Sequence, residues 1–143
     1  MAATTGLFGH GTLLKMHDGA ATYTTVLEVA DLSGPSMSAD SIEYTNHDSP
    51  SKYREFGAGL VDAGEISFTV NWQPAAATHG YSAGLLYVFS NRLTRLWRLI
   101  FTDSGATTYQ FYAFITGLDI KTPFDDKVSA DLTIKLTGLP TFA

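Results

Sequence analysis

The sequence predicts a mainly β protein, with an antiparallel β-sandwich or barrel-like fold and one flanking α-helix. Apolar and polar residues alternate along 60–72 and again along 127–137, as in strands with one buried face. Turn signals rich in Gly, Pro and Asp separate most apolar runs. A helical period is convincing only along 78–92. The 143 residues suffice for one core, so we expect 1–143 to be a single domain.

Seven strands are expected in chain order. Asp18-Gly19 is a hairpin signal between the first two, and Gly34-Pro35 breaks the chain before the third. Pro74 ends the fourth and clearest strand, and Asp103 to Gly105 forms the turn before the sixth. The expected strands are 11–17, 23–29, 36–44, 60–72, 95–103, 107–120 and 127–137.

Two strands have clearly opposed faces. The strand 60–72 directs apolar side chains to the core from Ile66, Phe68, Val70 and Trp72, and polar ones outward from Glu65, Ser67, Thr69 and Asn71. The strand 127–137 places Val128, Ala130, Leu132, Ile134 and Leu136 inward, against Lys127, Ser129, Asp131, Thr133, Lys135 and Thr137. The two outward faces are alike in chemistry, which suggests one sheet with a smooth, hydrated surface.

The expected helix, 78–92, has one apolar stripe. Thr78 is a suitable N-cap residue, whereas Gly80 and Gly84 weaken the first turn. The stripe consists of Tyr81, Leu85, Val88, Phe89 and Arg92. Such a helix would cover one side of the sandwich or barrel.

Two segments are expected to contact other subunits rather than the core. The loop 45–58 is long, polar and almost free of aliphatic residues, and loops of this length usually have a function. We expect it to be mobile in a free subunit and ordered by a neighbour. The terminus 1–10 carries the apolar pair Leu7-Phe8. It is either a flexible end or an arm that docks this pair on a neighbouring subunit.

Composition excludes several classes of function. A net charge of -5 disfavours stable binding of nucleic acid, which needs clustered Lys and Arg. The absence of cysteine excludes disulfides, zinc-thiolate sites and cysteine nucleophiles. The most apolar stretch, 93–101, is short and contains two arginines, so we expect no membrane insertion. No cofactor is expected.

Candidate catalytic and metal sites are weak. Residues 80–84 match the G-x-S-x-G nucleophile elbow, but all four histidines precede Ser82, and a hydrolase needs its histidine downstream. The histidines lack metal-ligand spacing, and Asp125-Asp126 is typical of a charged turn. We therefore expect no enzyme. The aromatic residues of 107–115 favour core packing, although stacking on sugars, in a carbohydrate-binding β-sandwich, remains an alternative.

One stretch resembles a known family. The run Leu32 to Glu43, then Asp48-Ser49-Pro50, Arg54-Glu55-Phe56 and Gly59 to Phe68, followed by Trp72-Gln73-Pro74, is similar to the tail tube (major tail) proteins of long-tailed phages. The helix, the strand with Arg95 and Arg98, and two long strands follow in the order of that family. The similarity is strongest to lambda-like tail tube proteins and to the equivalent protein of gene transfer agents.

The resemblance implies a structural subunit that forms hexameric rings, stacked into a tube through which DNA passes during ejection. Its implied partners are other copies of itself, a tape measure protein in the lumen, and tail terminator and tail-tip proteins. Its implied location is the virion, after synthesis in the host cytoplasm. An inner-tube protein of a contractile injection or secretion system is the alternative with the same fold.

The resemblance also assigns residues to surfaces. Contacts between rings or subunits would be made by Leu7, Phe8, Asp48, Lys52, Arg54, Glu55 and Phe56. The lumen would be lined by Glu65, Ser67, Thr69, Asn71, Ser129, Asp131, Thr133 and Lys135. If Lys127 and Lys135 face the lumen, the nearby Asp131 is the group expected to neutralise them.

Overall fold

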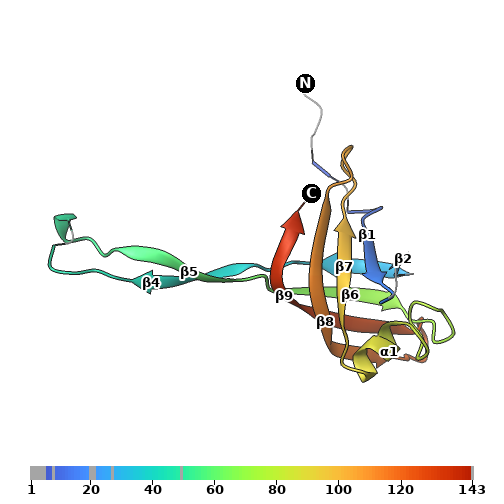
Figure 1. Ribbon diagram of the computed structural model, residues 1–143. Helices are drawn as coiled ribbons and strands as arrows, with labels where there is room; N and C mark the ends of the chain where they lie inside the picture. The colour runs from blue at the N-terminus through green and yellow to red at the C-terminus, as the bar shows by residue number, and fades with distance from the viewer. Residues whose placement is uncertain (1–5, 8, 20–21, 27, 49, 143) are drawn as a thin grey trace.

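In the computed structural model, which describes residues 6–7, 9–19, 22–26, 28–48 and 50–142, the chain forms two antiparallel sheets (Figure 1). The larger has the strand order β2-β1-β7-β8-β9-β6-β3, and the smaller pairs β4 with β5. This confirms the mainly β antiparallel class. The strands are β1 Leu13–His17, β2 Tyr23–Thr25, β3 Val29–Ser33, β4 Ser38–Glu43, β5 Phe56–Asp62, β6 Glu65–Asn71, β7 Thr94–Ile100, β8 Thr108–Lys121 and β9 Ser129–Phe142, and the helix is α1 Leu85–Ser90.

The larger sheet curls around its own inner face. In Figure 1 the first half of β8 runs between β7 and the end of β9, and its second half bends to run beside the first part of β9. The pairing of β8 with β9 shifts between Gln110 and Tyr112 and again between Ile115 and Gly117. Such bulges bend a strand and increase its twist. The two long strands therefore belong to both halves of the sheet, and the core lies between the halves.

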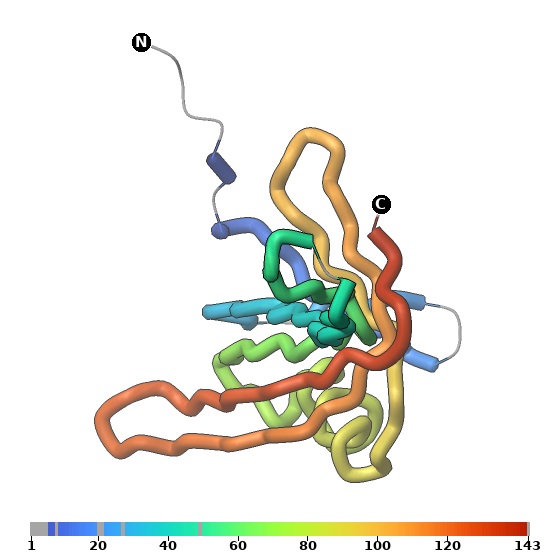
Figure 2. Tube along the Cα trace, turned by 90° about the vertical axis from the view of Figure 1, so that its left-hand side faces the viewer, coloured from blue at the N-terminus to red at the C-terminus, as the bar shows by residue number. Residues whose placement is uncertain are grey.

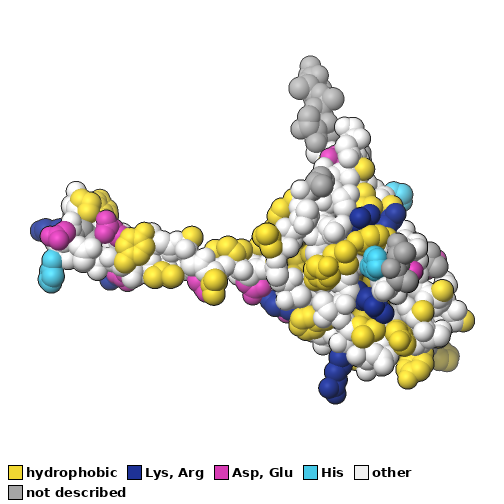
Figure 3. All heavy atoms as spheres, viewed as in Figure 1, with side chains coloured by type: hydrophobic (Ala, Val, Ile, Leu, Met, Phe, Trp, Pro, Cys, Tyr) yellow, Lys and Arg dark blue, Asp and Glu magenta, His cyan; other side chains and the backbone are white. Residues whose placement is uncertain are grey.

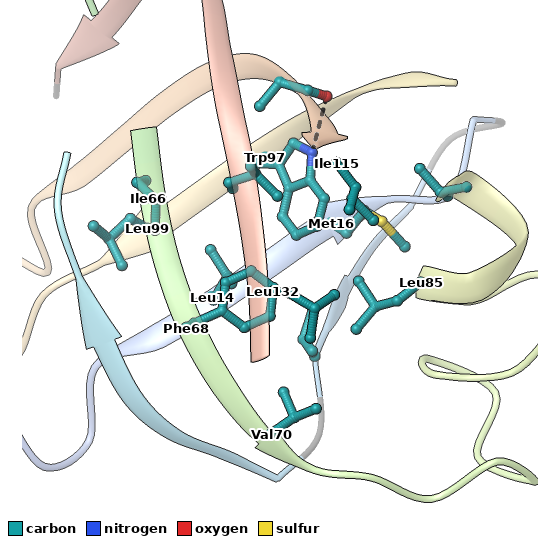
Figure 4. Close-up of a cluster of buried hydrophobic side chains, with 14 of the residues drawn as sticks. Leu14, Met16, Ile66, Phe68, Val70, Leu85, Trp97, Leu99, Ile115 and Leu132 are labelled. Atoms are coloured by element: carbon teal, nitrogen blue, oxygen red, sulfur yellow. Dashed lines mark hydrogen bonds between the residues drawn. The ribbon is translucent and has the colours of Figure 1, made fainter. Parts of the chain in front are cut away.

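The core contains the apolar faces of five strands, β1, β6, β7, β8 and β9, and two residues of α1. Trp97, at its centre, is fully buried, and its indole Nε1–H donates a hydrogen bond of 3.3 Å to the carbonyl oxygen of Ala113 (Figure 4). A buried indole needs such a partner. The predicted apolar faces of β6 and β9 are confirmed, since Ile66, Phe68, Val70, Trp72, Ala130, Leu132, Ile134 and Leu136 are all buried.

The predicted strand 23–29 is wrong, because the chain changes edge within it. Tyr23–Thr25 pairs with β1, whereas Val29–Ser33 pairs with β6 at the opposite end of the sheet order. Glu28 lies between them with φ 60. A left-handed backbone ends a strand, so one alternating stretch of sequence serves both edges of the larger sheet.

The predicted strand 60–72 is also divided. β5 ends at Asp62, and β6 begins at Glu65. Gly64 has φ +85, and a Cβ atom on it would lie 1.8 Å from the carbonyl oxygen of Ser36. Only glycine fits this crossing point, where the chain leaves the smaller sheet and enters the larger one.

The predicted helix 78–92 is too long. Residues 74–84 form turns, and α1 spans only Leu85–Ser90, with Gly84 in place of Thr78 at its start. The turns enclose His79, which is fully buried and stacks on Trp72 with ring centroids 5.3 Å apart. Leu85 and Val88 of the predicted stripe are buried, but Tyr81 is exposed. Packing of the turns around the His79 ring therefore overrides the helical pattern of the first two turns.

The last strand is displaced relative to the prediction. β9 begins at Ser129 and continues to Phe142, so Lys127 lies in the preceding turn. Val128, predicted to point inward, is 38% exposed. The extension beyond residue 137 is held by Phe142, whose ring packs edge-on against Tyr109 at 4.6 Å. This extension contains a glycine and a proline, which are disfavoured inside strands, so strand propensity did not predict it.

Candidate assembly surfaces

The eight residues predicted to line a lumen form one continuous polar face on β6 and β9. They face one another directly as four cross-strand pairs, which are Glu65–Lys135, Ser67–Thr133, Thr69–Asp131 and Asn71–Ser129. None is fully buried, whereas the alternate residues of both strands are. Side chains of directly opposed residues contact each other, so the polar face is a ladder of hydroxyl, amide and charged groups.

Asp131 is the electrostatic centre of the polar face. It accepts hydrogen bonds from Lys121 Nζ at 2.7 Å and from Thr69 Oγ1 at 2.9 Å. The hydrogen bond from Lys121, followed by that from Thr69, lowers the pKa of the Asp131 carboxyl. The same contact with Asp131 raises the pKa of Lys121. Both groups are thus held in their charged forms.

The predicted neutralisation of Lys135 by Asp131 is wrong. Lys135 Nζ instead lies 2.9 and 3.0 Å from the two carboxylate oxygens of Asp62, at the end of β5. The backbone N–H of Gly64 also donates to Asp62, and this bond, followed by the contact with Lys135, lowers the pKa of the Asp62 carboxyl. Lys121 and Lys135 are thus each paired with a carboxylate, Asp131 and Asp62 respectively.

Sequence reasoning missed the contribution of β8 to the polar face. Lys121 lies opposite Ser129, and Asp119 lies opposite Asp131. Before the shift at Ile115/Gly117, the inward residues of β8 have odd numbers, and after it Leu118 packs on the core instead. An alternation that changes phase at a bulge cannot be read as one strand face. The charged residues Asp119 and Lys121, two positions apart, were the signal available.

The four strands that carry or flank the polar face have two free edges in the described part of the chain. β3 is the last strand of the larger sheet. β8 pairs with β7 only up to Phe114, so from Ile115 to Lys121 it pairs with β9 alone. A free edge presents unpaired N–H and C=O groups and is a template for another strand.

The predicted loop 45–58 is the outer part of a long β-hairpin. β4 and β5 pair from Ser38–Asp62 to Glu43–Phe56 and project away from the rest of the molecule (Figure 1). We call this hairpin, residues 38–62, the arm. Within the predicted loop, the described residues from 45 to 55 lie outside the strands, whereas 56–58 belong to β5.

The arm exposes apolar side chains along most of its length (Figure 3). No described residue of the arm belongs to the hydrophobic core. Its exposed large apolar residues are Ile42, Tyr44, Tyr53, Phe56, Leu60 and Val61, of which Leu60 and Val61 are 84% and 71% exposed. Isolated two-stranded hairpins are marginally stable in water, and large exposed apolar surfaces mark interaction sites.

Two glycines of β5 make room for side chains of the opposite side of the hairpin. A Cβ atom on Gly57 would lie 2.7 Å from Tyr44 Cε1, and one on Gly59 would lie 3.1 Å from Ile42 Cδ1. The Tyr44 ring therefore lies across β5, and its hydroxyl donates to the carbonyl oxygen of Phe56 at 3.3 Å. An aromatic ring over a cross-strand glycine stabilises an otherwise uncovered pair of strands.

The polar residues predicted to make contacts lie at or near the outer end of the arm. Asp48 and Lys52 belong to its turn, and Glu55 donates its backbone N–H to Thr45 Oγ1 at 2.8 Å. Arg54 Nε lies 4.0 Å from Glu43 Oε1, and both side chains are exposed. A pair this open contributes little to stability, so these charges are available to a partner.

Of the apolar pair near the N-terminus, Phe8 lies outside the described residues. Leu7 is exposed and lines a groove of about 840 Å³. The lining of this groove also includes Val29, Leu32 and Phe101. The groove lies beside β3, at one of the two free edges.

The other sequence candidates acquire no catalytic geometry. Ser82 is exposed in a turn before α1, and the nearest histidine in sequence, His79, accepts a hydrogen bond on Nδ1 from the backbone N–H of Gln73. Phe111 is buried in the core, although Tyr112 is exposed. Among the described residues, no three His, Asp or Glu side chains are arranged to hold a metal ion. In the part of the chain that the structure describes, no helix is long and apolar enough to span a membrane.

Solved structures share the whole fold. The tail of an empty gene transfer agent (GTA) particle, refined with C6 symmetry, superposes with a TM-score of 0.79 at 21% identity, over 96% of this chain and 99% of that one. The sheath/tube terminator structure of the contractile injection system PVC has a TM-score of 0.72 at 14% identity, over 99% of both chains. The SPP1 tail tube has a TM-score of 0.68 at 14% identity, over 96% of this chain and 78% of that one.

Sequence comparison identifies the family. No curated protein matches the chain. A profile of the family described as lambda phage tail tube protein, TTP, matches residues 9–143. This match covers nearly the whole chain, including the polar face and the arm, and it agrees with the structural similarity to tail tubes. The chain therefore belongs to the lambda phage tail tube protein family, whose members are structural subunits of phage-like particles and not enzymes.

Proposed function

We propose that this chain assembles into hexameric rings that stack into a tail tube, with the polar face lining the lumen. The observation that carries the proposal is the polar face itself, a four-strand surface with a free edge on each side. Six copies agree with the C6 symmetry of the similar GTA tail. Residues 1–143 act in this account as one domain with one core.

The strand directions support a joined sheet. Along β8, β9, β6 and β3 the direction alternates, because each pair is antiparallel. In a ring generated by rotation, β3 of one copy therefore meets β8 of the next copy in antiparallel orientation. Joining these edges satisfies their backbone groups and continues the polar face from copy to copy.

The chemistry of the polar face suits the passage of DNA. Protein affinity for DNA grows with the number of phosphates that Lys and Arg neutralise. Lys121 and Lys135 are both held by carboxylates, and Glu65 and Asp119 add negative charge. A wall of this kind holds phosphates weakly, so DNA can slide during ejection. The same lumen would hold a tape measure protein before ejection.

The arm is the proposed contact between successive rings. Its exposed apolar surface would be buried against a neighbour, at about 25 cal/mol per Å². The charged groups of Asp48, Lys52, Arg54 and Glu55 would set the register around an anchor at Phe56. Leu7 and Phe8 would add a second contact. Terminator and tail-tip proteins would close the two ends of a tube made in the host cytoplasm and incorporated into the virion.

Electron microscopy of the purified protein, over a range of concentrations and salt conditions, tests this function. Hexameric rings or tubes are expected. A protein that stays monomeric at high concentration and is absent from rings in particles would contradict it.

An inner tube of a contractile injection system is the second candidate, favoured by the similarity to the PVC structure. Co-purification with a sheath protein would support it over a non-contractile tail.

A further inference from the structure

A groove between α1 and β8 is not used by the surfaces described above. It has a volume of about 500 Å³ and combines buried Val88 with two partly exposed rings. Phe89 is 38% exposed and Phe114 is 37% exposed. We call it the α1 groove, and it is lined by Val88, Phe89, Ser90, Arg92, Leu93, Phe114 and Ile115. A half-open apolar groove with two rings at its surface is typical of a binding site.

The α1 groove lies where the free edge of β8 begins. The last pair between β7 and β8 is Thr94–Phe114, and beyond it β8 continues to Lys121 without β7. Phe114 and Ile115 therefore belong both to the groove and to the first residues next to this edge. In the ring proposed above, on which this inference rests, the β3 edge of the next copy would lie along Ile115–Lys121.

The lengths of the β3 edge and of the free β8 edge restrict which residues of the next copy can lie at the α1 groove. β3 has five residues, and the free edge of β8 has about seven, so a fully paired β3 can shift by only about one residue either way. Because the strands are antiparallel, Ser33 at the end of β3 faces the Ile115 end of the edge. The chain after Ser33 then passes the α1 groove.

Within one subunit, the cross-strand pairs also place the residues after β3 at the same height along the strands as Phe114. Phe114 lies opposite Lys135, which lies opposite Glu65, and the carbonyl oxygen of Glu65 accepts the N–H of Ser36. Residues 34–37 are thus level with Phe114 across the four strands. Figure 2 shows the arm projecting from the body toward the viewer.

We propose that the α1 groove receives Met37 of the next subunit in the ring. Met37, the residue just before the arm, is 50% exposed, although its side chain is apolar. Methionine is flexible enough to fill an irregular groove and makes favourable contacts between its sulfur and aromatic rings, here Phe89 and Phe114. Asp40, exposed three residues further along on β4, is opposite in charge to Arg92, which lines the groove. The contact would fix where each arm leaves the ring.

The main competing occupant is Phe124, in the β8–β9 turn, which is fully exposed at 106%. It lies beyond Lys121, at the opposite end of the free edge from the groove. Residue pairs involving Met37 and Phe124 can therefore distinguish the two.

Disulfide trapping tests the proposal directly, because the chain contains no cysteine. The double variant M37C/F89C is oxidised after assembly and run on a non-reducing denaturing gel. A ladder of covalent oligomers ending at the hexamer is expected. The matched variant F124C/F89C should give about tenfold less product, since residues held far apart cannot form a disulfide. The single variants M37C and F89C control for random cross-linking.

The outcomes separate this contact from the proposed function. Tubes or rings that form normally but give no M37C/F89C ladder would overturn the contact and leave the tail tube intact. A strong F124C/F89C ladder would assign the groove to Phe124 and overturn the proposal. A ladder that extends beyond the hexamer would place Met37 in another ring and would also overturn it. Failure to form any ring or tube in the wild type would remove both.

Discussion

Shortening the arm is the perturbation whose effects on folding and on assembly differ most. In the variant, residues 44–55 are replaced by Asn-Gly, so that the cross-strand partners Glu43 and Phe56 flank a two-residue turn. The inner half of the arm, from Ser38–Asp62 outward, keeps its pairing. The variant removes the turn with Asp48 and Lys52 and leaves the crossing at Gly64 untouched.

The expected effect on folding is small. None of the deleted residues that the structure describes lies in the hydrophobic core. The lost hydrogen bonds, such as that from Tyr44 N–H to the Glu55 carbonyl oxygen, are exposed to water and contribute little. Shortening the closed loop by somewhat under half returns about 0.5 kcal/mol of closure entropy. The free energy of unfolding should therefore change by no more than about 0.5 kcal/mol, or about 1–2 °C in Tm for a domain of this size.

The expected effect on assembly is a loss of tubes, because the deleted segment carries Asp48, Lys52, Arg54 and Glu55, the charged groups of the proposed contact between rings. Circular dichroism melting measures the first effect, and electron microscopy of the same preparation measures the second. Tubes that form as in the wild type would refute the role of the outer arm. A drop in Tm of more than about 5 °C would instead refute the separation of arm from core.

Three further predictions concern stability. W97A should lower the free energy of unfolding by about 3–5 kcal/mol in a denaturant titration, because it empties the centre of the core; a loss below about 1 kcal/mol would contradict the packing. G64A should cost at least about 1–3 kcal/mol, since its Cβ would meet the Ser36 carbonyl oxygen, whereas G105A in an open turn is the control and should be near neutral. The pKa of Asp131 is lowered in the folded state, so its ionised carboxylate stabilises the fold at pH values above its unfolded pKa of 3.8. This stabilisation is lost as pH falls through the folded pKa. D131N should therefore flatten the decrease of Tm below about pH 4, and an unchanged profile would contradict the role of Lys121 and Thr69.

The sequence predicted best those strands that have one buried face. β6 and β9 each lie on the core with one side and on solvent with the other, so their alternation identified both the core residues and the polar face. The four cross-strand pairs between these faces depend on register and come from the structure. The match between the two polar faces in residue type was a true sign that the strands are neighbours.

The sequence failed where a strand has no buried face or changes phase. All six residues of β4 are exposed, so its burial does not alternate; the strand 36–44 was predicted, but not its pairing with β5 as a projecting hairpin. In β8 the shift at Ile115/Gly117 moved Asp119 and Lys121 onto the polar face. At Glu28 a left-handed residue that is not glycine divides a continuous pattern. Each failure reflects tertiary context that overrides a local pattern.

The helix was overpredicted for a related reason. The stripe of apolar residues at helical spacing is real at Leu85 and Val88, which are both buried. Upstream of it, the packing of His79 on Trp72 and the close backbone contact at Gly84 favour turns. Burial of one aromatic ring decides the local structure there.

The central claim is that the polar face of β6 and β9 lines the lumen of a six-fold ring. Cryo-electron microscopy of tubes assembled from the purified protein tests it most directly. The account predicts six subunits per ring, β3 of each joined to the free edge of β8 of the next, and Ser67 and Thr133 facing the channel. A ring in which β1 and β7 face the channel instead, or one with no pairing between β3 and β8, would contradict it.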